Sequence, residues 1–154
     1  MNILLISVGK WKKSPEKELF EHYASRLSWQ LELKEIESKE LSDTHKQKQQ
    51  EAEKILKAAE NFNAHHMIAL DERGKTMGSR DFATLLGRWK DEGAPRLAII
   101  IGGHAGLDES VRKKAHRTLS FGAMTWPHLL VRPLIAEQIY RSQCILSGHP
   151  YHRD

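Results

Sequence analysis

Short runs of apolar and β-branched residues, each followed closely by glycine, constrain the fold of this chain more than any other feature. Residues 3–6 read Ile-Leu-Leu-Ile, and residues 97–101 read Leu-Ala-Ile-Ile-Ile. Both runs are far shorter than a membrane-spanning helix, which needs about 20 apolar residues. A run without polar alternation is typical of a strand in a parallel sheet, because helices cover both faces of such a sheet.

Segments with helical periodicity alternate with these strands. Ser14 and Pro15, for example, form a typical helix start, with Phe20 and Tyr23 at helical spacing behind them. Strands are predicted at residues 2–8, 31–36, 65–70, 97–101 and 118–121, with a turn at 71–74. Helices are predicted from Ser14, at 52–62 after a polar loop, from a Ser79 cap to Gly93, at 108–116 and at 128–147. This alternation predicts one α/β domain over residues 1–154, a parallel sheet with helices on both faces.

Composition excludes several classes of protein. The chain has 154 residues, of which 40% are hydrophobic and 29% charged, as in ordinary soluble domains. Its single cysteine, Cys144, rules out an internal disulfide and a multi-cysteine zinc site, and we expect it to be a buried apolar residue. The N-terminal apolar run lacks the basic region and cleavage site of a secretory signal. We therefore expect a cytoplasmic protein with no membrane partner.

The positive charge lies in the second part of the chain. The net charge is +4, and residues 61–154 hold 13 Lys and Arg against 9 Asp and Glu. Such a distribution indicates either a polyanionic partner, such as nucleic acid, or a solubilising surface. Charge alone leaves both interpretations open.

Three loops are candidates for a ligand site, because ligands of parallel sheets lie beyond the carboxyl ends of the strands. They follow Leu70, Ile101 and Phe121. Glycines directly after residue 101 would let a ligand approach the backbone, or would form only a tight turn. Their spacing fits neither a P-loop nor the dinucleotide fingerprint, so neither ATP nor NAD chemistry is supported.

Two further segments are unusual for their places in the chain. Residues 119–128 are apolar where a surface loop should be polar, so this segment either wraps a flat ligand such as adenine or packs under the last helix. The C-terminal residues Tyr151, His152 and Arg153 are types that stack on bases or bind phosphate, although tails are often disordered. His149 and His152 lack further ligands at metal-binding spacing, so no metal is predicted.

Four motifs taken in order resemble one family. They are Ile101-Gly-Gly-x-x-Gly-Leu107, Leu119-Ser-Phe-x-x-Met-Thr-x-Pro-His128, Tyr140-Arg141 and the terminal Pro150-Tyr-His-Arg153. Together they resemble the small bacterial SPOUT methyltransferases that methylate N3 of a pseudouridine in 23S ribosomal RNA. The resemblance covers essentially the whole chain. It implies an α/β fold with a deep trefoil knot in its C-terminal third, an exception to the usual absence of knots.

The resemblance also implies a cofactor, partners and roles for particular residues. S-adenosyl-L-methionine would be bound by Leu70, Gly102, Phe121, Gly122, Ala123, Met124, Thr125 and Trp126. The substrate would be 23S rRNA in the ribosome or its large subunit, in a helix-loop near the decoding centre. The enzyme would be a homodimer in which the tail of one subunit faces the cofactor pocket of the other. His152 would act as a base or orienting group, and Arg141 or Arg153 would stabilise negative charge, with His128 a weaker candidate.

Two other functions are consistent with the residues alone. The chain could be a non-enzymatic ribosome-binding factor, or a small-molecule enzyme or regulator on a flavodoxin-like sheet. Arg132, Arg141 and Arg153 are few cations for binding bare RNA, which favours a preassembled ribosomal substrate. Pro133 departs from the family pattern and predicts that the regular part of the last helix begins near Arg132.

Overall fold

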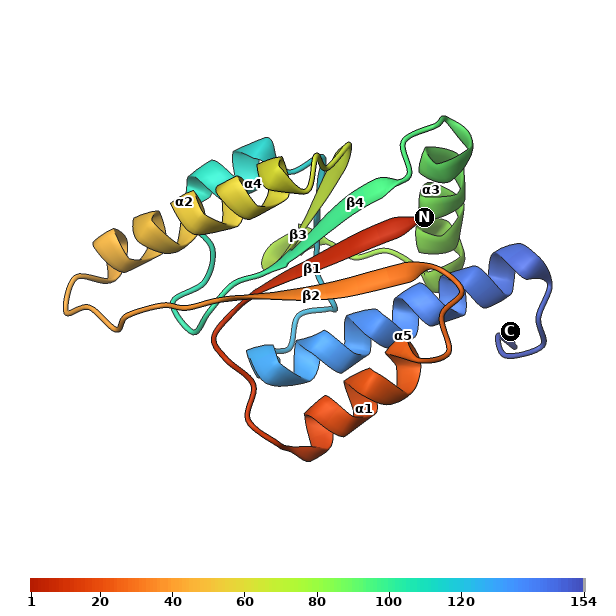
Figure 1. The fold of residues 1–154 in the computed structure, drawn as a ribbon, viewed down its shortest axis with the longest axis horizontal. Coiled ribbons are helices and arrows are strands. Elements are labelled where there is room, and N and C mark those ends of the chain that lie inside the picture. Colours follow the sequence, from red (N-terminus) through yellow and green to blue (C-terminus); the bar gives the residue numbers. More distant parts are fainter. Residues whose placement is uncertain (154) are drawn as a thin grey trace.

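The computed structural model, which describes residues 1–153, is a parallel sheet between two layers of helices (Figure 1). The strands are β1 (Asn2–Val8), β2 (Gln30–Ile36), β3 (His66–Lys75), β4 (Arg96–Ile101) and β5 (Arg117–Leu119), in the order β2-β1-β4-β3-β5. The helices are α1 (Pro15–Ala24), α2 (Thr44–Asn61), α3 (Ser79–Asp91), α4 (Glu109–Lys114) and α5 (His128–Ser147). Every strand pair is parallel, which confirms the predicted fold class.

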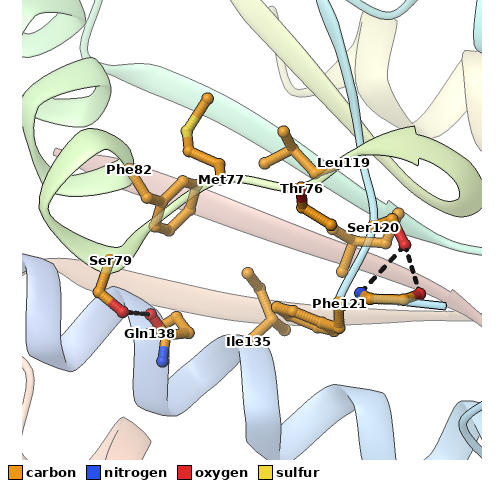
Figure 2. Close-up of a pocket in the computed structure, with 11 residues that line it drawn as sticks. Thr76, Met77, Ser79, Phe82, Leu119, Ser120, Phe121, Ile135 and Gln138 are labelled. Carbon is orange, nitrogen blue, oxygen red and sulfur yellow. Dashed lines mark hydrogen bonds between the residues drawn. The ribbon is translucent and has the colours of Figure 1, made fainter. Parts of the chain in front are cut away.

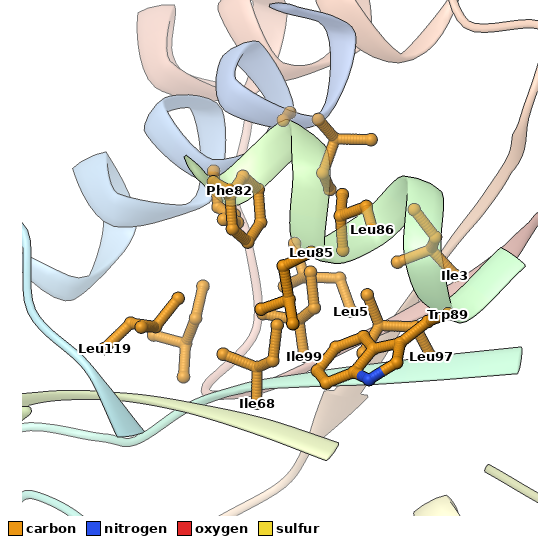
Figure 3. Close-up of a cluster of buried hydrophobic side chains, with 14 of the residues drawn as sticks. Ile3, Leu5, Ile68, Phe82, Leu85, Leu86, Trp89, Leu97, Ile99 and Leu119 are labelled. Atoms are coloured by element: carbon orange, nitrogen blue, oxygen red, sulfur yellow. The ribbon is translucent and has the colours of Figure 1, made fainter. Parts of the chain in front are cut away.

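Alternate residues of the central strands bury themselves against opposite helix layers. Ile3 and Leu5 of β1 pack with Leu97 and Ile99 of β4 in a cluster that includes side chains of α1, α3 and α5, and Figure 3 shows part of it. The intervening residues of both strands pack against α2 and α4 on the other face. Both runs identified in the sequence are therefore covered on both sides, as the absence of polar alternation predicts.

Three predicted boundaries differ from the structure. Residues 71–74 belong to β3, with a register shift against β5 between Leu70 and Lys75, where the sequence predicts a turn. Ser79 is the first residue of α3 and not its cap; the cap is Gly78, and the Ser79 hydroxyl donates to Gln138 Oε1 at 2.8 Å. Strand β5 ends at Leu119, so Phe121 lies outside it.

Two predicted helix starts also differ. Helix α2 begins at Thr44, inside the predicted polar loop, because the Asp43 side chain accepts hydrogen bonds from the backbone N–H groups of His45 and Lys46. Helix α5 begins at His128 and contains Pro133, so the expected delay to Arg132 is wrong. The C-terminal end of α5 at Ser147 is as predicted, and Gly148, in the left-handed conformation, caps it. None of the helices that the structure describes within residues 1–153 has the length and apolarity needed to cross a membrane.

Gly74 sets how closely β3 and β5 approach. A Cβ atom at this position would lie 2.6–2.7 Å from backbone atoms of Leu119 and Thr118. No real Cβ contact is this short, so a side chain here must displace β5. The segment that follows β5 would move with it.

Arg132 joins the start of α5 to the carboxyl ends of two strands. Its side chain is fully buried, and its Nη1 atom lies 3.0 Å from Glu35 Oε1 of β2. Its Nη2 atom donates to the carbonyl oxygens of Val8 and Gly9 at 3.1 and 2.8 Å, and its guanidinium lies over the ring of Trp11. Arg132 therefore does not reach RNA, which corrects its place among the RNA-binding cations.

Substitution of Gly74 by alanine should destabilise the fold by about 2 kcal/mol, because the added methyl group overpacks a backbone contact. Gly87→Ala is the matched control. Its Cβ would meet only the side chain of Leu146, with Cδ2 nearest at 2.9 Å, and this flexible, exposed side chain can move aside. Alanine is also favoured over glycine inside a helix by about 1 kcal/mol. In urea unfolding, the free energy of unfolding should therefore be lower for Gly74→Ala than for the wild type, and equal or higher for Gly87→Ala. Equal loss in both variants would contradict the close packing of β3 on β5.

Glu35→Gln should lower the free energy of unfolding by about 3 kcal/mol, because it leaves the fully buried guanidinium of Arg132 uncompensated. Arg132→Met should also lower it, by less, because the Glu35 carboxylate that it leaves without a cation is partly exposed. The double variant should lose clearly less than the sum of the two. Glu21→Gln serves as control, since its pair with Lys17 is exposed and should contribute less than about 1 kcal/mol. Additive losses in the double variant would show that the buried pair does not couple the two residues.

Candidate active site

The largest cavity of the site lies at the carboxyl edge of the sheet, where β3, β4 and β5 end. It has a volume of about 460 Å³. Leu70 immediately precedes the register shift of β3 against β5, Gly102 follows β4, and Phe121 lies just after β5. All three residues line the cavity. The three loops predicted from the strand order therefore meet at one place.

Seven of the eight residues assigned to the cofactor line this larger cavity. They are Leu70, Gly102, Phe121, Gly122, Met124, Thr125 and Trp126. Ala123 belongs to the same segment but is not among the lining residues. Met124 and Trp126 are exposed apolar side chains on the wall of this cavity. The arrangement brings the predicted residues together, and their binding of a ligand stays a prediction.

A smaller cavity of about 280 Å³ lies beside the first, between the start of α3 and the segment after β5. Figure 2 shows its apolar side chains, including Phe82, Leu119 and Ile135, with Ser79 and Gln138 at one edge. Leu70, Phe121 and Gly122 line both cavities. The residues after β5 thus form a common wall between two hollows.

A serine hydroxyl holds the turn of that wall. Ser120 Oγ donates to the carbonyl oxygen of Gly122 at 2.8 Å and accepts from the Gly122 N–H at 3.2 Å (Figure 2). The backbone N–H of Ser120 donates to the carbonyl oxygen of Lys75 at 3.1 Å. The apolar segment of residues 119–128 is therefore anchored to β3. This packing is compatible with both interpretations of the segment, as a wall around a flat ligand and as a loop packed under the last helix.

Gly102 is required by the tight loop after β4. A Cβ atom here would lie 3.1 Å from the carbonyl carbon of Gly106 and from the side chain of Leu107. The loop folds back on itself so closely that any larger residue pushes it outward. Its backbone is thereby left facing the larger cavity without a side chain in between.

Arg112 is a residue of this region that the sequence does not reveal. The short basic helix α4 suggests solvated cations, yet the Arg112 side chain is only 14% exposed. Its Nη1 atom donates to Asp71 Oδ2 at 3.1 Å and to the carbonyl oxygen of Leu107 at 2.6 Å. Glu109, followed by Asp71, raises the pKa of this guanidinium. Arg112 therefore ties Asp71 of β3 to Leu107 in the loop after β4, and both residues line the larger cavity.

His128 stands where α5 begins, on the wall of the larger cavity. Burial lowers the pKa of its imidazole, and the positive charges of Arg132 and His104 lower it further. The neutral form is therefore favoured at neutral pH. This residue is thus better suited to accept or donate a hydrogen bond than to supply a fixed positive charge.

The C-terminal tail folds back onto the middle of α5, and its residues are not among those that line the larger cavity. Arg141 Nη1 lies 3.1 Å from His152 Nδ1, and the Tyr151 hydroxyl donates to Glu137 Oε1 at 2.9 Å. Arg153 is exposed. Val131 lines the larger cavity and is ten residues from Arg141, about 15 Å along the helix. The two halves of the predicted site are therefore not brought together within one chain.

Within residues 1–153, which the structure describes, no group of three or more His, Cys, Asp or Glu side chains is placed to bind a metal ion. Cys144 is buried, as its prediction as an apolar residue requires.

Comparison with known proteins identifies the family. A family model described as predicted SPOUT methyltransferase matches residues 1–152. The chain is 46% identical over 153 residues to ribosomal RNA large subunit methyltransferase H of Rhodospirillum centenum (strain ATCC 51521 / SW). It is 47% identical over 153 residues to the protein of that name in Paramagnetospirillum magneticum (strain ATCC 700264 / AMB-1). Each alignment covers 99% of both proteins.

Solved structures agree on the fold. A probable methylase family protein from Haemophilus influenzae Rd KW20 superposes with a TM-score of 0.64 at 14% identity, over 99% of this chain and 71% of that one. A probable methyltransferase from Bordetella pertussis Tohama I gives 0.56 at 18% identity, over 92% and 95% of the two chains. Because the family match and the relatives both extend over nearly the whole sequence, the chain belongs to the SPOUT methyltransferase family.

Proposed function

We propose that this chain transfers a methyl group from S-adenosyl-L-methionine to N3 of a pseudouridine in 23S ribosomal RNA, within the ribosome or its large subunit. The observation that carries the proposal is the cavity at the carboxyl edge of the sheet, lined by seven of the eight residues that the resemblance assigns to the cofactor. Family membership supports methyl transfer, and the names of the relatives support large-subunit rRNA as substrate. Because the proposed substrate is part of the ribosome, we expect the enzyme in the cytoplasm.

The cavity fits a cofactor of this kind in size and chemistry. Its volume of about 460 Å³ is within the range of small-molecule sites, roughly 300–1,000 Å³. Trp126 and Leu70 offer apolar surface for a flat base, and the bare backbone at Gly102 offers hydrogen-bonding groups. Leu70, Gly102 and residues 121–126 would hold the cofactor.

The tail would supply the remaining chemistry. Bound S-adenosyl-L-methionine supplies an electrophilic methyl group, whose bond to sulfur breaks as the new bond to nitrogen forms. N3 of pseudouridine carries a proton and reacts only when that proton leaves, so the enzyme must favour the anion. His152 would act as base or orienting group, and Arg141 or Arg153 would stabilise the negative charge.

The geometry of α5 supports a homodimer in which the tail acts on the other subunit. The tail is hydrogen-bonded to Glu137 and Arg141 in the middle of the helix, beyond the first turn that lines the larger cavity. Reaching that cavity in its own chain would require the tail to give up these contacts. A second copy brings a tail to the cavity without this loss, and each site is then shared between two chains.

The distribution of cations supports a preassembled substrate. Of the three arginines considered for RNA, Arg132 is buried and Arg141 is paired with Glu137, which leaves Arg153 exposed. Fewer phosphate contacts mean weaker binding to bare RNA. The ribosome can instead present the target nucleotide in a fixed position.

Methyl-labelled S-adenosyl-L-methionine should transfer its label to 23S rRNA as N3-methylpseudouridine when the protein is incubated with ribosomes that lack the modification. Label should be strongest with ribosomes or large subunits and weak with naked rRNA. The Gly102→Val variant should lose cofactor binding in calorimetry, because its side chain fills the tight loop after β4. Cofactor binding without any label would mean a different substrate, and no binding at all would favour a non-enzymatic ribosome-binding factor.

Mixing two inactive variants should restore activity if the site is shared between subunits. Gly102→Val damages the cavity, and His152→Ala with Arg153→Ala damages the tail. After unfolding and refolding together, half of the dimers contain one intact cavity that faces one intact tail, so about a quarter of the sites become active. A site built within one chain predicts no recovery from the mixture. Thermal melting of each variant alone controls for misfolding.

A further inference from the structure

Four side chains form a connected cluster where the tail meets α5. Glu137 Oε1 accepts from Arg141 Nε at 2.9 Å and from Arg141 Nη2 at 2.5 Å. The third guanidinium nitrogen of Arg141, Nη1, lies 3.1 Å from His152 Nδ1. The Tyr151 hydroxyl donates to the same carboxylate oxygen of Glu137. Glu137 is thus the centre of contacts that hold both the arginine and the tail.

The cluster is packed firmly enough to fix an orientation. The Glu137 side chain is 15% exposed and the Arg141 side chain 25%. Arg141 lies over one side of the Tyr151 ring at 4.9 Å from its centroid, and Arg26 lies 5.7 Å from the same centroid. Burial, then hydrogen bonding to Tyr23 and Glu137, raises the pKa of Tyr151, so its hydroxyl keeps its proton. Tyr151 therefore anchors the tail next to His152.

The contact between Arg141 and His152 defines where the imidazole carries its proton. Arginine has five N–H donors and no acceptor, and it stays charged in proteins. Glu137 raises the pKa of Arg141, so the guanidinium keeps all of its N–H protons. His152 Nδ1 must therefore accept the hydrogen bond. In a neutral imidazole whose Nδ1 accepts, the proton is on Nε2.

We propose that Glu137 is a positioning residue that fixes His152, through Arg141, as an Nε2–H donor, and that His152 acts on the pseudouridine ring by donating this hydrogen bond and not as the base. This inference rests on the proposed function and selects one of the two roles considered for His152. It also gives Arg141 a defined task, which is to occupy the imidazole nitrogen that would otherwise accept a proton.

The reaction then balances without a histidine base. The N3 proton passes to solvent water or hydroxide before methyl transfer. The nitrogen lone pair forms the bond to the methyl carbon, and the electrons of the carbon–sulfur bond remain on sulfur. The Nε2–H group donates to a carbonyl oxygen beside N3, where the negative charge of the ring anion is spread, and keeps its proton throughout.

Nitrogen NMR tests the proton position without any methylation. In the ¹⁵N-histidine-labelled protein, with His152→Asn used to assign the resonance, His152 should appear as the Nε2–H form. Arg141→Met and Glu137→Met should shift it toward a mixture of both forms, and Glu53→Met, an exposed glutamate on α2, should not. A His152 that carries its proton on Nδ1, or that is unchanged in both variants, would overturn the proposal.

Kinetics on ribosomes tests the role in the reaction. Glutamine places an amide N–H near the position of Nε2 and is not a base, so His152→Gln should stay within about tenfold of the wild-type single-turnover rate. His152→Ala should fall about a hundredfold or more. Glu137→Met should lower the rate while leaving the cofactor dissociation constant unchanged, and Glu53→Met should change neither.

The pH dependence separates the two roles further. If the N3 proton leaves to solvent, the wild-type rate should keep rising beyond pH 8, as the ring ionises. A rate that levels off above about pH 7, where histidine bases are ordinarily unprotonated, with His152→Gln as slow as His152→Ala, would establish a base and overturn the proposal. If the wild type methylates nothing, the proposed function fails, and the NMR result still decides the orientation of His152.

Discussion

The buried guanidinium of Arg132 fixes where the last helix meets the sheet. One side chain contacts the ends of β1 and β2 and the ring of Trp11. Burial lowers the pKa of this group, and Glu35 opposes that shift by holding the charge. Because Arg132 is one turn from His128 on α5, the same contact sets the position of the cavity wall. The candidate site therefore depends on an ion pair whose two residues do not line the larger cavity, since the pair determines the direction in which α5 leaves the cavity.

The fold could be predicted where local pattern and tertiary structure agree. Apolar runs became buried strands, and the helix start capped by Ser14 and the end of α5 at Ser147 are as predicted. The failures come from contacts between distant segments. Residues 71–74 look like a turn, but pairing with β5 keeps them extended. Proline inside α5 is tolerated because the helix is held on either side by α1 and α3.

The candidate site divides in the same way. Its cofactor loops could be predicted, because the carboxyl ends of parallel strands must meet at one edge. The charged residues that organise them could not. Arg112 and Arg132 read as solvated charges in a helix pattern, and only Asp71 and Glu35, supplied by other segments, show that each is paired. Glu137 pairs with Arg141 of its own helix, but its contact with Tyr151 of the tail is visible only in the structure. Membership of the family implies the knotted C-terminal region, which no periodicity in the sequence can indicate.

One helix connects both halves of the proposed chemistry. The first turn of α5 lines the larger cavity, and its middle both reaches the smaller cavity at Gln138 and holds the tail through Glu137 and Arg141. Gln138 accepts from Ser79 and donates to Glu137 Oε2 at 2.7 Å, so a chain of hydrogen bonds runs from a cavity wall to the tail cluster. A rigid helix keeps these two places apart. The proposed shared site would therefore use α5 itself, because each subunit would present a pre-formed tail at a fixed distance from its own cavity and direct it at the cavity of the other.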